Sequence, residues 1–256
     1  MPGPGEEPPG WLLDDWTVLL GRTPGPLHVI TLNAQYLYEI VRGGLLDELR
    51  FPLLCTIDSR PLYLALRAAG IAARWSPGSR TLPDIRRGLD RCDAALVIGG
   101  PPGSALRIAP GLPALQESDL TPDRIARFVR ENRGRGDGGV TLAMIFMGCP
   151  RQDLIAARIQ RELADEGGDA CVVTIGLGGS LDQWSGQLPR CPLIVSRLGL
   201  EGFWRLACEP RWFRVKRILI SGLGLLLAPW ALRRLNAHSR AYPRPADRPC
   251  AASAAA

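Results

Sequence analysis

The sequence predicts an α/β fold: a mainly parallel Rossmann-like sheet with helices on both faces, plus a C-terminal helical membrane-associating appendage. Short apolar runs alternate with longer amphipathic segments through most of the chain, as they do where a helix follows each strand of a parallel sheet. Glycine-rich or polar turns follow several of these runs, where ligands of such sheets bind. A basic segment beside an uncharged apolar segment near the C-terminus indicates the appendage.

The apolar runs define the predicted strands, and the amphipathic segments between them define the helices. The first strand is predicted at residues 27–32, and a helix follows it to about residue 49. Further strands are predicted at residues 51–57, 72–75, 93–98, 139–147 and 170–175. Further helices are predicted at residues 61–69, 82–91, 121–132 and 153–166.

Four parts are expected along the chain. Residues 1–26 are predicted to be a disordered or short helical N-terminal extension, because their first ten residues are too poor in apolar side chains to order. Residues 27–197 form the α/β core. Residues 198–237 form a basic and apolar helical appendage, which begins with a helix predicted at residues 198–217. The Pro-, Arg- and Ala-rich residues 238–256 form a disordered tail.

Polar or small residues stand at the carboxyl ends of three predicted strands. Thr31 and Asn33 follow the first strand, Asp58 follows the second, and the turn 99–103 follows the strand at 93–98. Asn33 and Asp58 also suit the N-cap position of the next helix, and local sequence favours that interpretation of Asn33. The functional alternative is that they line a cleft, where a carboxylate can accept a proton from a bound hydroxyl.

The C-terminal region carries most of the net charge. The chain has a formal charge of +6. The segment from Arg205 to Arg248 contains ten basic residues and only two acidic residues. Residues 218–232 carry no charge and are too short for a straight membrane span, which needs about 20 residues. We expect this segment to lie in the interface of an anionic membrane, with a buried core helix as the alternative.

Several enzyme classes are excluded. The chain has no Gly-x-Ser-x-Gly motif and only two histidines, His28 and His238, which disfavours a hydrolase with a histidine base. No Asp-x-Asp pair or other metal-ligand cluster is present in the sequence, so no metal or other cofactor is expected. Seven scattered cysteines without a Cys-x-x-Cys pair, and an acidic N-terminus without an apolar signal segment, predict reduced thiols and a cytoplasmic location.

Three motifs between Met147 and Trp212 carry a family resemblance. They are a Gly-Cys-Pro-Arg-Gln turn, a Gly-Gly-x-x-Asp-x-x-x-Gly turn followed by Arg-x-Pro, and Gly-Leu-Glu followed by Arg-Leu and Glu-Pro-Arg. Together they resemble the WecG/TagA/CpsF family, glycosyltransferase family 26. The resemblance covers residues 27 to 217, with the motifs in the family's order.

The resemblance implies an inverting, metal-independent hexosyltransferase at the cytoplasmic face of the inner membrane, bound peripherally. It would move a sugar from a UDP-sugar to a polyprenyl-diphosphate-linked saccharide in exopolysaccharide or cell-surface polysaccharide biosynthesis. The donor would be N-acetylmannosamine, its uronic acid or glucose. Asp58 would be the general base, and the substrate-binding residues would be Thr31, Asn33, Arg74, Gly78, Ser79, Gly100, Gln152, Gly178, Asp182, Arg190, Arg205, Arg211 and Arg214.

Two other functions compete with this one. The chain departs from the family's pattern at Ser59, Arg80 and Gly202, which fits a degenerate member that binds a nucleotide sugar or a partner without turnover. Retention of Asp58, Asn33 and Gln152 argues against that alternative. A nucleic-acid-binding protein is disfavoured, because the basic charge adjoins an apolar run and lacks interleaved aromatic residues.

Overall fold

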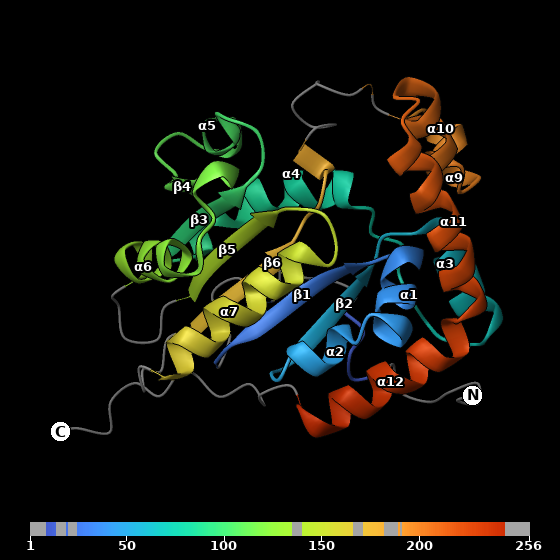
Figure 1. The fold of residues 1–256 in the computed structure, drawn as a ribbon, viewed down its shortest axis with the longest axis horizontal. Helices are drawn as coiled ribbons and strands as arrows, with labels where there is room; N and C mark the ends of the chain where they lie inside the picture. Colours follow the sequence, from blue (N-terminus) through green and yellow to red (C-terminus); the bar gives the residue numbers. More distant parts are fainter. Residues whose placement is uncertain are drawn as a thin grey trace.

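The computed structural model describes residues 9–13, 19, 25–134, 140–165, 171–181, 189 and 191–243. Its centre is a six-stranded, all-parallel sheet with the strand order β2-β1-β6-β5-β3-β4 (Figure 1). This confirms the predicted Rossmann-like α/β class. The strands are β1 Leu27–Leu32, β2 Leu53–Ile57, β3 Ala94–Gly99, β4 Ala114–Leu115, β5 Val140–Phe146 and β6 Cys171–Gly176.

The strands form because their residues are buried on both sides of the sheet. Every residue of β1, β2, β5 and β6 is buried, as expected for strands that helices cover on both faces. The predicted strand at 72–75 is wrong, since only Trp75 pairs, in an isolated bridge to Ile57. The two-residue β4 was not predicted, because so short a strand leaves no apolar run to detect.

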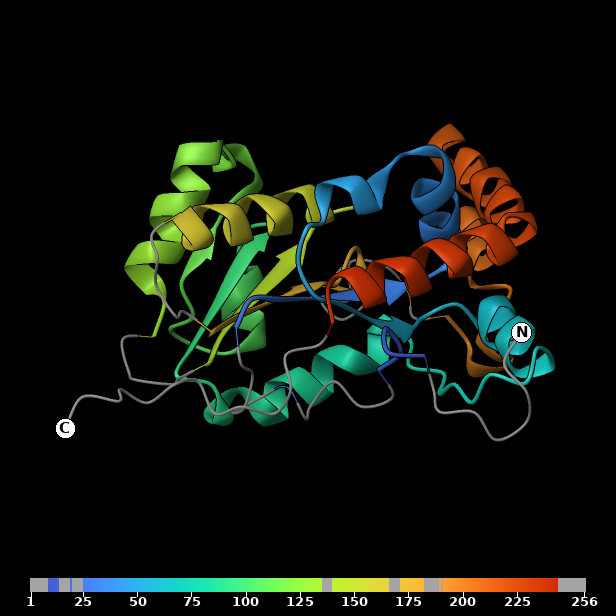
Figure 2. The same ribbon diagram turned by 90° about the horizontal axis from the view of Figure 1, so that it is seen from below.

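Helices cover both faces of the sheet. On one face α4 and α5 pack against a core that includes Leu82 and Ile108, while α1, α6, α7 and α12 pack on the other (Figure 2). The helices are α1 Ala34–Arg42, α2 Leu45–Glu48, α3 Arg60–Ala68, α4 Gly78–Gly88, α5 Ser104–Ile108, α6 Pro122–Asn132, α7 Arg151–Asp165, α9 Leu193–Arg197, α10 Glu201–Cys208, α11 Trp212–Leu226 and α12 Ala228–Ala241. Short 3-10 turns lie at Leu89–Arg91 and Glu117–Asp119.

The C-terminal helices pack against the core with one face only. Helix α11 crosses α1 so closely that a Cβ atom on Gly224 would overlap the backbone of Ala34, and Ala231 and Leu235 of α12 are fully buried. The opposite face leaves Leu223, Leu226 and Trp230 exposed. The segment at 218–232 is therefore both part of the core and part of the surface.

No single helix in the described ranges is long and apolar enough to cross a membrane. Helices α11 and α12 pass that test only as a pair, and they are bent by 73° at Leu227. The predicted continuous helix at 198–217 is wrong, because the chain breaks at Glu209 and Pro210 between α10 and α11. Proline there removes a backbone donor and favours an extended residue before it.

Two further expectations are corrected at the ends of the chain. Helix α12 runs to Ala241, beyond the predicted boundary at residue 237. Residues 11–13 are not helical, since Leu12 pairs as an isolated bridge with Cys55; most of the short helix expected at residues 11–20 lies outside the described residues. Among the described residues, five cysteines are free, whereas Cys171 is disulfide-bonded, so the prediction of reduced thiols is wrong at that position.

Candidate active site

Two adjoining cavities open above the carboxyl ends of the strands. One, of about 410 Å³, contains Asp58 and is called the Asp58 cavity. The other, of about 510 Å³, contains Glu117 and is called the Glu117 cavity. Both are lined by Gly148, Gly178, Gly179, Arg205, Arg214 and Arg217. These shared residues come from the turns after β5 and β6 and from α10 and α11, so the C-terminal helices complete the site.

Asp58 enters its cavity directly from the end of β2. Its backbone N–H donates to the carbonyl of Leu32 at 2.9 Å, and its carbonyl accepts from the Trp75 indole N–H at 2.9 Å. The cap of helix α3 is Ser59, whose hydroxyl accepts from the Leu62 N–H at 3.5 Å. The capping interpretation of Asp58 is therefore wrong, and Asp58 lines the cavity instead.

Asn33 and Thr31 line the same cavity, and both also have internal partners. The Asn33 side chain caps α1 by accepting from the backbone N–H groups of Gln35 and Tyr36 at 3.0 and 3.3 Å. The Thr31 hydroxyl donates to the carbonyl of Gly176 at 2.9 Å. Capping and cleft lining are alternatives for Asn33 in the sequence, and the structure realises both.

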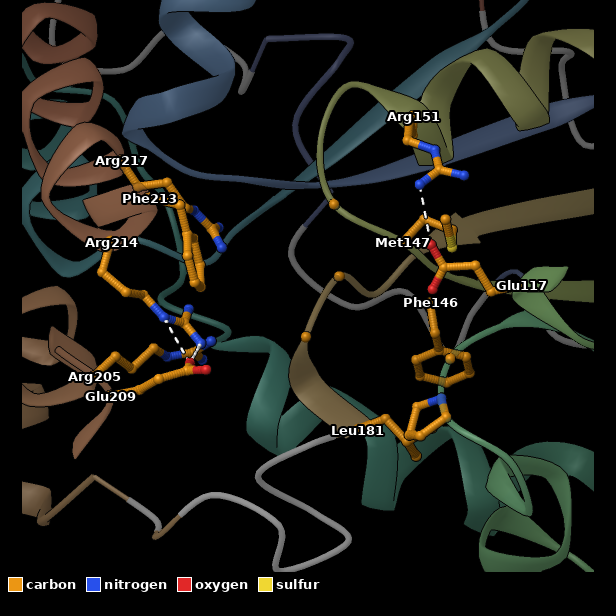
Figure 3. A pocket seen from close by; sticks show the side chains of 15 residues that line it. Glu117, Phe146, Met147, Arg151, Leu181, Arg205, Glu209, Phe213, Arg214 and Arg217 are labelled. Carbon is orange, nitrogen blue, oxygen red and sulfur yellow. Dashed lines mark hydrogen bonds and ion pairs between the residues drawn. The ribbon is translucent and has the colours of Figure 1, made fainter. Parts of the chain in front are cut away.

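An arginine cluster forms the wall that the two cavities share. Arg205 comes from α10, while Arg214 and Arg217 lie three residues apart on one face of α11 (Figure 3). Arg205 donates to Glu201 at 2.7 Å and Arg214 donates to Glu209 at 2.5 Å. Three guanidinium groups thus face two carboxylates, which leaves the wall with excess positive charge.

The charge of the cluster is visible in the pKa of Arg217. Arg217 is partly exposed, but the groups crowded around its guanidinium keep water away from it and lower this pKa. The positive charges of Arg205 and Arg214 lower it further, while Asp58 acts in the opposite direction. Arg217 still donates from Nε to the side-chain oxygen of Gln35 at 3.1 Å. Asp58 and the three arginines line the same cavity, so the carboxylate and the cluster belong to one site.

The opposite wall of the Glu117 cavity is less charged. Figure 3 shows Glu117, Arg151, Phe146, Met147 and Leu181 facing the arginine cluster across the cavity. Arg151 donates to Glu117 at 3.0 Å. Gly100 also lines this wall and has a positive φ of 76°, a conformation that side chains other than glycine rarely adopt.

Gln152 lies behind the site, with only 1% of its surface exposed. Its side-chain oxygen accepts from the backbone N–H of Gly178 at 2.9 Å, and its amide nitrogen donates to the Tyr36 hydroxyl. Both ends of the amide are therefore engaged within the protein, although the residue borders the Asp58 cavity.

The remaining predicted site residues lie elsewhere. Arg74 and Arg211 are both exposed and border neither cavity, and Arg211 pairs with Glu209 at 3.1 Å. Gly78 and Ser79 lie in the first turn of helix α4. Asp182 and Arg190 lie outside the described residues.

Sequence reasoning missed several residues of the site. Arg217 is absent from the predicted set, although its spacing from Arg214 could have indicated it. Arg60 was also missed; its guanidinium carbon stacks over the rings of Tyr63 and Trp75, at 4.7 and 5.0 Å from their centroids. Among the described residues, no group of three or more His, Cys, Asp or Glu side chains could hold a metal ion.

Comparison with known proteins identifies the family. The sequence model of the glycosyl transferase WecG/TagA/CpsF family matches residues 14–240. The match spans both the α/β core and the C-terminal helices that complete the cavities. Membership implies a glycosyltransferase of cell-surface polysaccharide synthesis, with a nucleotide-sugar donor and a lipid-linked acceptor. The chain, from its sheet to its arginine cluster, belongs to the WecG/TagA/CpsF family of glycosyltransferases.

Proposed function

We propose that this protein is an inverting, metal-independent hexosyltransferase. It moves a sugar from a UDP-sugar to a polyprenyl-diphosphate-linked saccharide in exopolysaccharide or cell-surface polysaccharide synthesis. N-acetylmannosamine, its uronic acid and glucose are the candidate donor sugars. The observation that carries the proposal is the lining of the Asp58 cavity, which combines one carboxylate at a strand end with the three guanidinium groups of the arginine cluster.

Asp58 is the general base of the proposed reaction. Its carboxylate takes the proton of the acceptor hydroxyl while the hydroxyl oxygen attacks the anomeric carbon. The bond from that carbon to UDP breaks on the opposite side, so the configuration inverts. The electron pair leaves with the β-phosphate, whose added negative charge is stabilised by Arg205, Arg214 and Arg217.

The exposed faces of α11 and α12 are proposed to rest on an anionic membrane at the cytoplasmic surface. Leu223, Leu226 and Trp230 are exposed beside the basic residues of the same helices, a combination typical of helices that lie in a membrane interface. Vesicles containing anionic lipid should co-sediment the protein. The double variant Leu226→Ser/Trp230→Ser should bind them less, and equal binding would contradict this part of the proposal.

The catalytic proposal is tested by measuring UDP release from a panel of UDP-sugars with a synthetic lipid-diphosphate-sugar acceptor. Acceptor-dependent release should persist in chelator and fall at least about a hundredfold in Asp58→Asn, because loss of a general base costs about 10² to 10⁴ in rate. Asp84→Asn, which removes an exposed carboxylate on α4, should retain full activity.

Two results would contradict the proposal. UDP release that depends on added metal would overturn the metal-independent mechanism. Undiminished UDP release by Asp58→Asn would show that Asp58 is not the general base. Binding of UDP-sugar without release by the folded native chain would favour the alternative, a degenerate family member that binds without turnover.

A further inference from the structure

A chain of buried polar side chains lies directly behind the two cavities, and the proposed reaction does not use it. It starts at the backbone N–H of Gly178, which lines both cavities, and passes through the side chains of Gln152 and Tyr36. The Tyr36 hydroxyl lies 3.1 Å from Oδ1 of Asp153, which is also 3.0 Å from Nε2 of His28. All four side chains are at most 1% exposed.

The direction of each hydrogen bond in this chain is determined by its start. The Gly178 N–H can only donate, so it requires the oxygen of the Gln152 side chain. The amide nitrogen of Gln152 then donates to the Tyr36 oxygen, and the single Tyr36 proton goes to Asp153. Burial raises the pKa of Tyr36 well above its ordinary value, and Asp153 raises it further, so the phenol keeps this proton.

The turn from Gly176 to Gly178 is held from two sides. Thr31 donates to the carbonyl of Gly176, and Gln152 accepts from the N–H of Gly178. Gln152 packs so tightly under the turn that a Cβ atom on Gly176 would lie 2.7 Å from its Cδ. Glycine at position 176 is thus required for Gln152 to reach the turn.

We propose that Gln152, Tyr36, Asp153 and His28 are positioning residues that fix the Gly178 turn on the wall between the two cavities. This inference rests on the proposed function, because that function places the nucleotide and the acceptor at the Gly178 turn. It differs from the sequence prediction for Gln152, which treated the residue as a substrate contact. The turn presents its backbone to the ligands, and the buried chain determines where that backbone lies.

The test reverses the direction of the hydrogen bonds that link Gln152, Tyr36 and Asp153. In Gln152→Glu, the oxygen that replaces the amide nitrogen faces the Tyr36 oxygen, whose single proton already goes to Asp153. Repulsion between these two oxygens should push the introduced side chain away from Gly178. In Gln152→Glu/Asp153→Asn, the new amide can donate to both Tyr36 and His28, and the Tyr36 proton can turn to the introduced carboxylate. The single variant should therefore lower UDP affinity about tenfold or more, the effect of losing a buried hydrogen bond, and the double variant should restore it.

A third variant separates hydrogen-bond direction from charge. Relief of repulsion between two buried carboxylates would also make the double variant better than the single one. Adding Tyr36→Phe to the double variant removes the hydroxyl through which the reversal operates, so the restored affinity should be lost. If the double variant keeps its restored UDP affinity after Tyr36→Phe is added, the proposed direction of these hydrogen bonds is wrong.

Hydrogen exchange of the Gly178 amide provides a readout that needs no ligand. Exchange should be faster in Gln152→Glu and in Gly176→Ala, and slow again in the double variant. Gln160→Met is the matched control, since Gln160 lies on the same helix, is 3% exposed and donates to Val172 and Leu27 instead. It should lower the melting temperature without changing exchange at Gly178.

The two readouts distinguish the possible failures. If the native protein binds no UDP but the exchange pattern is found, the proposed function fails and the fixing of the turn stands. If UDP binds and its affinity follows thermal stability alone, with no response at Gly178, the four residues are merely structural and the inference is overturned.

Discussion

Substitution of Gly224 by alanine tests whether the close crossing of α11 and α1 positions the arginine cluster. A Cβ atom at this position would lie 1.8 Å from the carbonyl oxygen of Ala34 and 2.9 Å from its carbonyl carbon. Real side-chain carbons stay at least 3.0 Å from such atoms. Helix α11 would therefore have to move away from α1 by about 1.2 Å, because the obstacle is backbone and cannot rotate aside.

Two opposing effects set the change in stability. Replacing glycine with alanine inside a helix stabilises it by about 1 kcal/mol, whereas overpacking of a close contact costs about 1 to 3 kcal/mol. We expect the overpacking to dominate at Gly224, because the overlap is with backbone. Gly222 is the matched control: it lies on the same helix and has no atom within 4 Å of its added Cβ, so Gly222→Ala should be stabilised.

The melting temperature should thus fall in Gly224→Ala and rise in Gly222→Ala. The two melting temperatures should differ by several degrees, because 1 kcal/mol of unfolding free energy shifts the melting temperature by about 2 to 4 °C in a protein of this size. Gly224→Ala should also lose about a hundredfold in sugar transfer, because a shift of about 1 Å in positioning groups has that effect, and α11 carries Arg214 and Arg217. If Gly224→Ala melts as high as Gly222→Ala, the described crossing of the helices is wrong.

Two further predictions concern charge and pH. Arg217→Met should weaken UDP binding measured by calorimetry, while Lys216→Met, an exposed neighbour that borders neither cavity, removes the same charge and should not; equal effects would mean that only net charge matters. The raised pKa of Tyr36 means that the folded state keeps a proton that the unfolded chain loses above about pH 10. Unfolding free energy should therefore fall as pH rises through that range, and less steeply in Tyr36→Phe; identical slopes in urea titrations would contradict the cause given for the shift.

The sheet was predictable because each buried parallel strand leaves a continuous apolar run, and because such strands all end at one edge. That rule alone predicts that Thr31, Asn33 and Asp58 lie together. It does not say what their side chains do there. Asn33 caps helix α1. Asp58 does not cap helix α3, because Ser59 supplies that cap one residue later. Local sequence alone could not decide whether Asp58 or Ser59 would be the N-cap of α3.

The role of Gln152 could not be predicted from the sequence, since its partners are far away in the chain. Gly178 is 26 residues from it and Tyr36 is 116 residues away. A glutamine near a strand end suggests a ligand contact when only its neighbours in sequence are known. The fold instead buries its amide between a turn and a tyrosine, so its influence on a ligand passes through the Gly178 backbone.

The tail arginines show how one helix boundary decides which residues enter a site. In a single helix over 198–217, Arg205, Arg211 and Arg214 would point in several directions. Nothing in that pattern would separate the arginines that line the cavities from the one that does not. The break at Pro210 restarts the helix at Trp212, which leaves Arg211 as its exposed N-cap beside Glu209. Arg214 and Arg217 then share one face because they are three residues apart. A proline and a helical spacing therefore predict the pair that the cavities contain, once the break is recognised.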